Sequence, residues 1–308
     1  MLIKDRIPRT KEIQELKKLL QLPLTSQQRF LLKRELCFMI SGEKGEQDSE
    51  YFINFYYKPS NNWVVLHDLR LEHSGQSAQI DHLLINRLMD FYVLETKNFC
   101  YHLRITEHGD FLVSDGKEEH AIESPIEQNK RHIHLLQKVI ENNDIMPKRF
   151  GIPIIPRFRS YVLISPKSKV IWPDRSKFDT SHIIKADTME STIMDNAERD
   201  SKKILGSIKS ISKLSSLDSI TKIANRLVQL HKPCSIDYRK KFGIFEQHKS
   251  NDKNKLSKVK QNEADSIQGE YYCYECQKAI SLKAAKFCWA DKSRFSGRAY
   301  CFYCQQNF

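Results

Sequence analysis

Two acidic residues, Asp81 and Glu95, each lie within a short apolar segment of the chain. The segments, residues 79–85 and 91–97, have the length and composition of strands. A charged side chain inside such a strand is costly to bury unless it has a partner, a metal or a chemical task. Because strand side chains alternate between faces, Glu95 and Lys97 share a face, and Asp81 can join them if the strands pair. The pattern predicts a divalent-cation site with an activated water, or else a structural Glu–Lys pair beside an unrelated aspartate.

The composition limits the class of protein and its partners. The net charge is +12 over 308 residues, which favours a polyanionic partner and argues against an enzyme of neutral metabolites. No apolar run approaches membrane-spanning length, and the first residues lack the apolar core of a signal peptide. We therefore expect a cytoplasmic protein with no membrane partner. In a reducing compartment, its eight cysteines indicate metal ligands or buried thiols rather than disulfides.

Helical and extended patterns alternate along the chain. Ser41-Gly42 is expected to interrupt the first helical region, and Ser124-Pro125 to begin a later helix. The polar, Lys-rich residues 247–268 are expected to form a flexible linker. The expected helical regions are residues 11–57, the segment from Ser124 to about 140, and 188–231, and the further expected strands are residues 63–71, 101–106, 111–114, 160–165 and 182–185.

Four stretches together resemble the nuclease-related domain, NERD, a branch of the PD-(D/E)XK nuclease superfamily. They are Gly-Glu-Lys-Gly-Glu at 42–46, Gln-Ile-Asp-His at 79–82, Leu-Glu-Thr-Lys-Asn at 94–98 and Ser-Pro-Ile-Glu-Gln-Asn at 124–129. The resemblance covers about residues 40–190. It implies an α/β fold with a mixed central sheet flanked by helices, and metal-dependent hydrolysis of nucleic-acid phosphodiesters.

The resemblance also implies individual roles. Asp81 and Glu95 correspond to the acids that bind Mg²⁺ or Mn²⁺, and Lys97 to the motif lysine. Glu46 corresponds to an assisting acid on the preceding helix, and Gln128 to a polar residue on the helix after the sheet. Two positions depart from the pattern: Ile80 stands where the motif has its first proline, and the turn at residues 87–90 lacks a glycine that relatives often have.

Other interpretations of these helix and rim residues stay open. Glu43 and Glu50 share helical spacing with Glu46, so the assignment could shift by a turn, and all three could form a solvated helix face. Gln128 could be a surface residue. A second group of side chains is predicted to line a phosphate-binding rim or to have ordinary structural roles: His82, Lys130, Arg131, His132 and His134.

The last forty residues contain two Cys-X-X-Cys pairs. Cys273 with Cys276, and Cys301 with Cys304, predict a tetrahedral Zn²⁺ site in a module that resembles short zinc ribbons. Cys288 could replace one of these ligands or pack as a small apolar residue, and unrelated buried thiols are the alternative to a zinc site. The aromatic and basic side chains of the module predict contact with single-stranded nucleic acid, packing around the zinc, or a protein-binding ribbon.

These observations predict a metal-dependent nuclease, with DNA as the expected substrate and a zinc module that aids binding. An RNA-directed enzyme is a further possibility, and the alternative from another class is a non-catalytic nucleic-acid- or protein-binding module on a nuclease fold. The expected parts are a helical extension at residues 1–40, the nuclease-like domain at 41–190, a helical segment that packs on it at 191–246, the linker at 247–268 and the zinc module at 269–308.

Overall fold

The computed structural model divides the chain into two compact units, Met1–Glu246 and Gln247–Phe308. It describes residues 1–99, 102–114, 116, 118–196, 215–244, 271–274, 279–280, 282–295, 297–301 and 305. The expected linker and residues 197–214 of the expected helical segment lie outside this range. In the described part of the chain, no helix is both long and apolar enough to cross a membrane.

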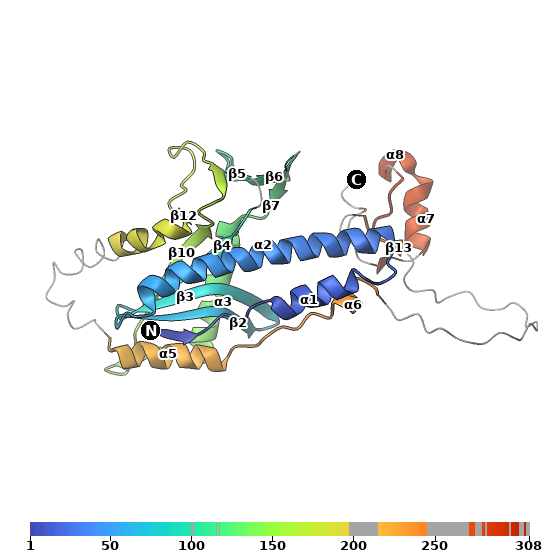
Figure 1. The fold of residues 1–308 in the computed structure, drawn as a ribbon. Coiled ribbons are helices and arrows are strands. Elements are labelled where there is room, and N and C mark those ends of the chain that lie inside the picture. Colours follow the sequence, from blue (N-terminus) through green and yellow to red (C-terminus); the bar gives the residue numbers. More distant parts are fainter. Residues whose placement is uncertain are drawn as a thin grey trace, which may run out of the picture. The chain divides into compact units, whose positions relative to one another are not determined.

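A six-stranded mixed sheet forms the centre of the larger unit (Figure 1). Its order is β1-β2-β3-β4-β10-β12, with bounds Leu2–Lys4, Trp63–His73, Gln76–Asn86, Asp90–Lys97, Arg157–Ile164 and Ile183–Lys185. The strands β2, β3 and β4 pair in antiparallel fashion, whereas β1, β10 and β12 each pair in parallel with their neighbours. A second sheet has the order β11-β5-β6-β7, with bounds Lys169–Ile171, His102–Ile105, Phe111–Ser114 and Glu119–Ile122.

Helices cover both faces of the central sheet, and this arrangement confirms the expected α/β fold class (Figure 1). The helices α3 (Pro125–Asn142) and α5 (Leu217–Gln229) bury one face, together with apolar residues of β2, β3 and β4. The long helix α2 (Ser26–Tyr57) packs on the other face. Two shorter helices, α1 (Thr10–Leu19) and α6 (Tyr238–Lys241), share a small core with the first half of α2. A 3-10 turn, η1 (Ala186–Thr188), and the helical residues 189–196 follow β12.

The first sixty residues differ from their expected organisation. The predicted interruption at Ser41-Gly42 is wrong, because α2 continues through it without a break. Thr25 and Gln28 form a reciprocal capping box that starts the helix early. The expected boundary at residue 40 therefore falls inside α2. Residues 2–4 also belong to the central sheet rather than to a helical extension.

The strands β2 and β3 change face at the same level. On β2, Leu66 and Leu69 both enter the core under α3 and α5, although strict alternation would place them on opposite faces. The same shift separates Ile80 from Leu83 on β3. Asp68, which lies between the paired positions of the two strands, has a left-handed backbone with φ of 55°. As a result, two consecutive residues on each strand, 67–68 and 81–82, are left out of this core.

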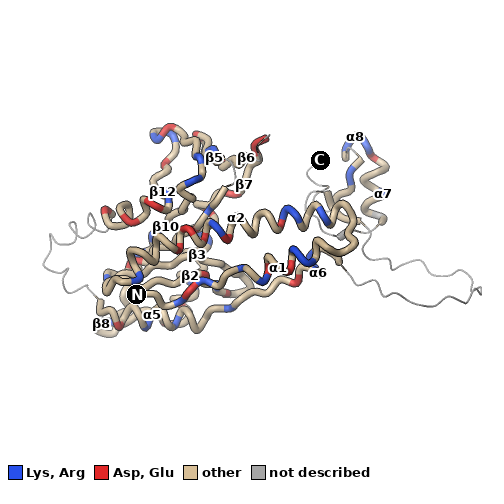
Figure 2. Tube along the Cα trace, viewed as in Figure 1, with Lys and Arg blue, Asp and Glu red and all other residues tan. Residues whose placement is uncertain are grey.

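The smaller unit has its own core. The strands β13 (Tyr271–Tyr272) and β14 (Ala279–Ile280) form a short hairpin, followed by α7 (Leu282–Ala290) and α8 (Lys292–Phe295). Its buried side chains include three cysteines, Cys273, Cys288 and Cys301. Cys276 and Cys304 lie outside the described residues. In the larger unit, lysine and arginine are interspersed with acidic residues along the described chain (Figure 2).

Candidate active site

The acids of the two central strands meet where β3 and β4 part. The antiparallel ladder between these strands extends from Ile85–Phe91 to His82–Leu94. One step further, the backbone N–H of Thr96 donates to Oδ2 of Asp81 at 2.8 Å. The Asp81 carboxylate thus accepts a hydrogen bond that a backbone carbonyl of β3 would accept in a regular ladder, and it lies between the two strands. The prediction that the two segments are paired strands is confirmed.

Glu95 and Lys97 point toward the other side of the site, where α3 begins. The Lys97 ammonium donates to Glu95 Oε1 at 2.8 Å and to Gln128 Oε1 at 3.0 Å. Ser124 caps α3, as predicted, and its hydroxyl accepts from the N–H of Glu127. The cap sets where the first turn of α3 begins, and thereby where Gln128 meets the lysine. The structure therefore brings Gln128 to the acids from a distant part of the sequence.

His132 is a site residue that the sequence indicated only as part of a rim. It lies one helical turn after Gln128, so both side chains face Glu95. His132 Nδ1 is 3.3 Å from Glu95 Oε2, and both side chains are almost fully buried. Neither atom makes a hydrogen bond of good geometry with the part of the chain that the structure describes. A buried carboxylate oxygen without a strong partner is a candidate ligand atom.

The two carboxylates have opposite electrostatic surroundings. Burial, and the nearby carboxylates of Glu95 and Glu46, raise the pKa of Asp81 well above its usual value. Burial alone would also raise the pKa of Glu95, but His132 and Lys97 outweigh it and hold that pKa below its usual value. Without a cation, Glu95 is therefore the more strongly ionised acid of the pair.

Glu46 reaches the site from α2. Its pKa is raised by burial, against the favourable charges of Arg9 and Arg6. Arg9 donates to Glu46 Oε1 at 2.8 Å. The two acids that share its helical spacing are held elsewhere, because Glu43 and Glu50 both accept hydrogen bonds from Arg6. Of the three, Glu46 is the acid whose charge acts on Asp81. Both arginines belong to the segment after β1, and no pattern in the sequence connects that segment with the acids of α2.

The expected phosphate-binding rim is only partly assembled. His82 is fully buried under α2, so of the two roles left open for it the structural role holds and the rim role does not. Beside the acids lies a hollow of about 520 Å³, bordered by α3 and by the start of β3. Its lining includes Lys130, Arg131, His132 and His134 together with Gln76 and Ser77. The two cations pair with Glu127 and Glu123, but these pairs are exposed and therefore weak.

The donor set suits a hard divalent cation. Mg²⁺ prefers oxygen ligands and commonly uses one or two carboxylates with waters and substrate phosphates. Asp81 and Glu95 supply two such carboxylates, and Glu95 Oε2 is buried without a strong partner. Among the residues that the structure describes, no three His, Cys, Asp or Glu side chains are gathered closely enough to hold a metal by themselves. The site therefore fits a cation that relies partly on water and substrate oxygens.

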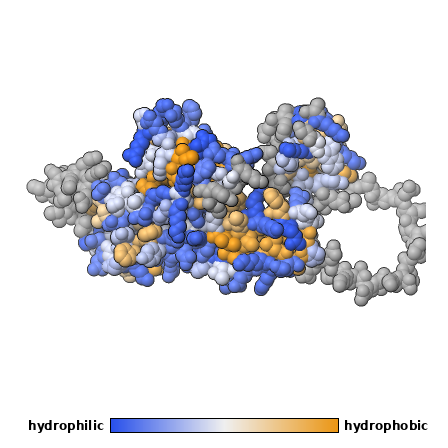
Figure 3. All heavy atoms as spheres, turned by 45° about the horizontal axis from the view of Figure 1, so that its top comes forward, coloured by the Kyte–Doolittle hydropathy of each residue, from blue (hydrophilic) through white to orange (hydrophobic). Residues whose placement is uncertain are grey.

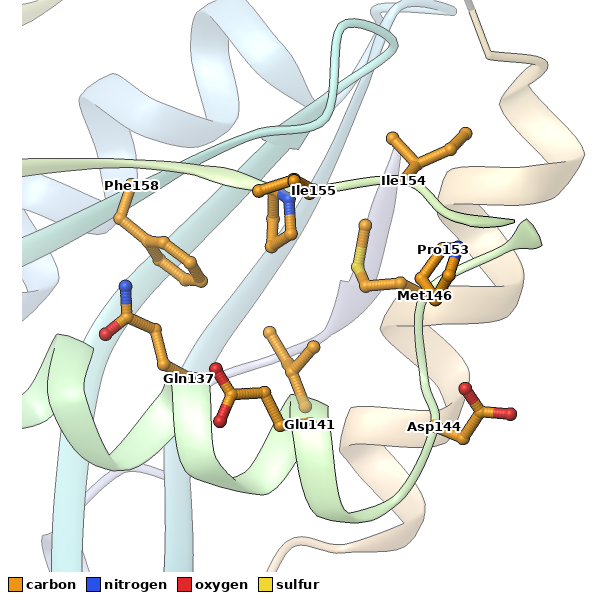
Figure 4. Close-up of a pocket in the computed structure, with 10 residues that line it drawn as sticks. Gln137, Glu141, Asp144, Met146, Pro153, Ile154, Ile155 and Phe158 are labelled. Atoms are coloured by element: carbon orange, nitrogen blue, oxygen red, sulfur yellow. The ribbon is translucent and has the colours of Figure 1, made fainter. Parts of the chain in front are cut away.

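A second cavity, of about 350 Å³, lies at the far end of α3 (Figure 4). Ile140 and Met146 contribute apolar lining, and Glu141 and Asp144 contribute carboxylates. Phe158, near the start of β10, closes another side. Gln128 and the acids are not among the residues that line it, so this cavity is separate from the acid site.

The cysteine unit places part of its predicted ligand set together. Cys273 and Cys301 are buried in the same small core. Cys288 is buried there too, and its sulfur accepts from the Tyr300 N–H and from Gln305 Nε2, each at 3.3 Å. Backbone and amide donors can stabilise a thiolate as well as a thiol, so these contacts suit both readings of Cys288.

The fold and the acid site together define a nuclease-like α/β domain. Residues 41–165 match the family model of the nuclease-related domain, NERD. This stretch includes β2, β3, β4, α3 and β10, and it contains every residue predicted for the acid site: Glu46, Asp81, Glu95, Lys97 and Gln128. Over these residues the chain is therefore similar to the nuclease-related domain. No curated protein and no solved structure matched the chain.

Proposed function

We propose that this chain is a metal-dependent nuclease that hydrolyses phosphodiester bonds of nucleic acid, with DNA as its substrate. The observation that carries the proposal is the convergence of Asp81, Glu95 and Lys97 where β3 and β4 part. Two carboxylates and a lysine at one point of a central sheet are costly to maintain unless they have a task. The family match over residues 41–165 supports this reading.

Asp81 and Glu95 would hold Mg²⁺ or Mn²⁺, with Glu46 as an assisting acid. When bound, such a cation lowers the pKa of a water molecule and neutralises charge on the phosphoryl group. The raised pKa of Asp81 supports this role, because burial and the neighbouring carboxylates of Glu95 and Glu46 outweigh the favourable charge of Lys97. Cation binding at this position would supply further positive charge.

Lys97 and Gln128 would orient the attacking water. A lysine ammonium has three N–H donors, and Glu95 and Gln128 accept two of them in the structure. The third is available to a water or to a phosphate oxygen. In the reaction, the oxygen of water bonds to phosphorus as the water gives up a proton, the bond from phosphorus to the departing sugar oxygen breaks, and that oxygen takes up a proton. The lysine also offsets negative charge that develops on the phosphoryl oxygens.

The smaller unit would bind Zn²⁺ through Cys273, Cys276, Cys301 and Cys304, with Cys288 as the possible substitute. Support comes from the shared core of Cys273 and Cys301, since zinc ligands must lie together. A zinc-stabilised module joined by a linker would raise the local concentration of nucleic acid at the acid site. Metal analysis of the full chain would test it: Cys273→Ser and Cys301→Ser should each lose zinc. Cys37→Ser, at an exposed thiol of the larger unit, should keep it.

The decisive experiment is cleavage of single-stranded, duplex and branched DNA, and of RNA, with Mg²⁺ or Mn²⁺. We expect Asp81→Ala, Glu95→Ala and Lys97→Ala each to abolish cutting while nucleic-acid binding remains. Lys222→Ala removes an exposed cation of α5 and is the matched control that should cut normally. A wild-type protein that binds these substrates but cuts none of them would instead be a binding module on a nuclease fold.

A further inference from the structure

Two buried histidines face one another beneath α2. His67 and His82 occupy directly opposed positions on β2 and β3, and neither side chain is exposed to solvent. Their Nδ1 atoms are 2.7 Å apart. A polar pair at the centre of a sheet is unusual, because two apolar side chains of similar size would pack there without any hydrogen-bonding requirement.

The partners of the two rings determine a single pattern of protons. His67 Nε2 lies 3.1 Å from Asn54 Oδ1, which can only accept, so this nitrogen carries the hydrogen. His67 Nδ1 is then an acceptor, and His82 Nδ1 must donate to it. His82 Nε2 is left to accept from the hydroxyl of Thr96, 3.1 Å away. Burial lowers the pKa of His67 to about 4, and that of His82 well below its usual value, in agreement with two neutral rings.

This series of hydrogen bonds ends at Thr96, the residue that donates to the Asp81 carboxylate. Thr96 binds the His82 ring through its hydroxyl, and its backbone N–H donates to Asp81 Oδ2. At its other end the series is fixed to α2 through Asn54. The path therefore connects α2, β2, β3 and β4 at the level where the β3–β4 ladder stops and the ordinary backbone bonds no longer hold the two strands together.

We propose that His82 is a positioning residue for the acid site, which holds the Thr96 peptide so that its N–H carries the Asp81 carboxylate, while His67 fixes which nitrogen of the His82 ring accepts from Thr96. The inference rests on the proposed nuclease function for its catalytic consequence. The geometric part, from Asn54 to the Thr96 amide, does not depend on it. A purely structural pair would contribute stability but would leave the Thr96 amide and the acids unaffected by the identity of the ring.

Two conservative variants of His82 separate its hydrogen bond to His67 from its hydrogen bond to Thr96. In His82→Asn the side-chain amide reaches the Nδ1 position and can keep the bond to His67, but the bond to Thr96 is lost. In His82→Gln the amide reaches the Nε2 position and can keep the bond to Thr96. Thr96→Val removes the same bond from the other side. Each variant is compared with the full-length wild type at matched folded fraction.

Two measurements decide the outcome. Amide hydrogen exchange of residue 96, followed by NMR without metal, should be about tenfold faster in His82→Asn and in Thr96→Val, and near wild type in His82→Gln. Under cleavage conditions, the first two should lower kcat by about 10- to 100-fold with little change in KM. Their double variant should be no worse than either alone, because both break one link.

Unchanged exchange and kcat in His82→Asn would overturn the inference, and so would a His82→Gln variant as impaired as His82→Asn. If the wild type cuts no substrate, the proposed function fails. The exchange measurement would still decide whether His82 positions the Thr96 amide.

Discussion

Asp81 and Glu95 are not equivalent, although both are carboxylates at one site. Glu95 accepts from the Lys97 ammonium and lies beside His132, so its charged form is favoured. Asp81 accepts from one backbone N–H and is repelled by two other acids. In the absence of a cation the protein thus stores unfavourable electrostatic energy at Asp81. This arrangement is typical of functional sites, where stability is given up for chemistry.

The raised pKa of Asp81 predicts a stabilising substitution. The native state binds the Asp81 proton more tightly than the unfolded chain does, so stability falls as pH rises from the usual value of 3.8 through the higher native pKa. Above that range the penalty is complete. Asp81→Asn keeps an oxygen that can accept from Thr96 and removes the charge. In EDTA at pH 8 we expect its free energy of unfolding in urea to exceed that of the wild type, with the gain vanishing toward pH 4.

Glu95→Gln is the control with the opposite sign. The pKa of Glu95 is lowered, so its charge stabilises the native state above the usual value of 4.5, and this stabilisation is lost as pH falls through the lower native pKa. The variant should be less stable than the wild type at pH 8. If both variants are less stable than the wild type, then the charge of each acid stabilises the native state. That result would contradict the opposite pKa shifts of Asp81 and Glu95.

At the scale of elements, the contact between α2 and β4 depends on one glycine. A Cβ built on Gly45 would lie 2.5 Å from the Cβ of Asn98, closer than real atoms approach. Ser41 and Asn98 exchange two further hydrogen bonds beside it. The close approach lets Glu46 reach the acids. Gly42, three residues earlier in the same helix, has open space around it.

The two glycines of α2 therefore make a matched pair. Gly42→Ala should stabilise the protein by up to about 1 kcal/mol, because alanine is the better helix former and nothing obstructs its methyl group. Gly45→Ala should destabilise it by about 1–3 kcal/mol, since α2 or β4 must move to admit the methyl group. Urea unfolding of both variants measures the difference. Equal effects at the two positions would contradict the close packing of α2 on β4.

A second element carries backbone strain on its surface. The hairpin of β8 (Lys148–Arg149) and β9 (Ile152–Pro153) turns through Phe150, whose φ is 53° and whose side chain is 97% exposed. A bulky residue is unfavourable in this left-handed region, whereas asparagine tolerates it. Phe150→Asn should raise the free energy of unfolding by up to about 1 kcal/mol. Phe150→Ala removes the ring but keeps the strained backbone type, so it should give a smaller gain in the same urea titration.

The sequence could predict the elements around the site better than the contacts within it. Short, mostly apolar segments identified β3 and β4, and Ser124 identified the start of α3, because these signals are local. The role of His132 and the arginine on Glu46 depend on residues that meet only after folding. The change of face at Asp68 was hidden for a different reason. It breaks the alternation on which strand prediction relies, so an alternation rule places its neighbours on the wrong side.

For the whole molecule, the net charge is +12, and over the residues that the structure describes lysine and arginine are spread along the chain rather than gathered into one block (Figure 2). Apolar side chains are also exposed in places on the surface (Figure 3), and those of α2 include Phe30, Phe38 and Phe55. If the chain binds nucleic acid as proposed, we expect the general attraction to be weak and sensitive to salt, and we expect Lys130 and Arg131 to orient the nucleic acid at the acids.

Removing the two positive charges beside the acid site tests whether Lys130 and Arg131 contribute more to binding than other exposed cations. The double change Lys130→Gln and Arg131→Gln should weaken binding to an oligonucleotide and reduce the slope of log affinity against log salt by about one to two. Lys138→Gln, on the same helix and also paired with a glutamate three residues away, lies outside the hollow and should change the slope by less. Binding is measured without metal, so that cleavage does not interfere. Equal slopes for the two variants would show that the hollow is not part of the surface that binds nucleic acid.

Because β2 and β3 change face at the same level, the positions that point into the core are set separately on the two sides of this level. The outer half of the hairpin, from Leu69 to Ile80, is set by the turn at Ser74-Gly75, and its inner half by the acid site. One residue added on the turn side would invert the outer half alone, whereas two added to each strand would lengthen the hairpin and preserve both halves. The change of face at Asp68 thus separates the outer half of the hairpin, whose length can vary, from the inner half, whose length cannot. An engineer could extend the outer half in steps of two per strand without moving Asp81.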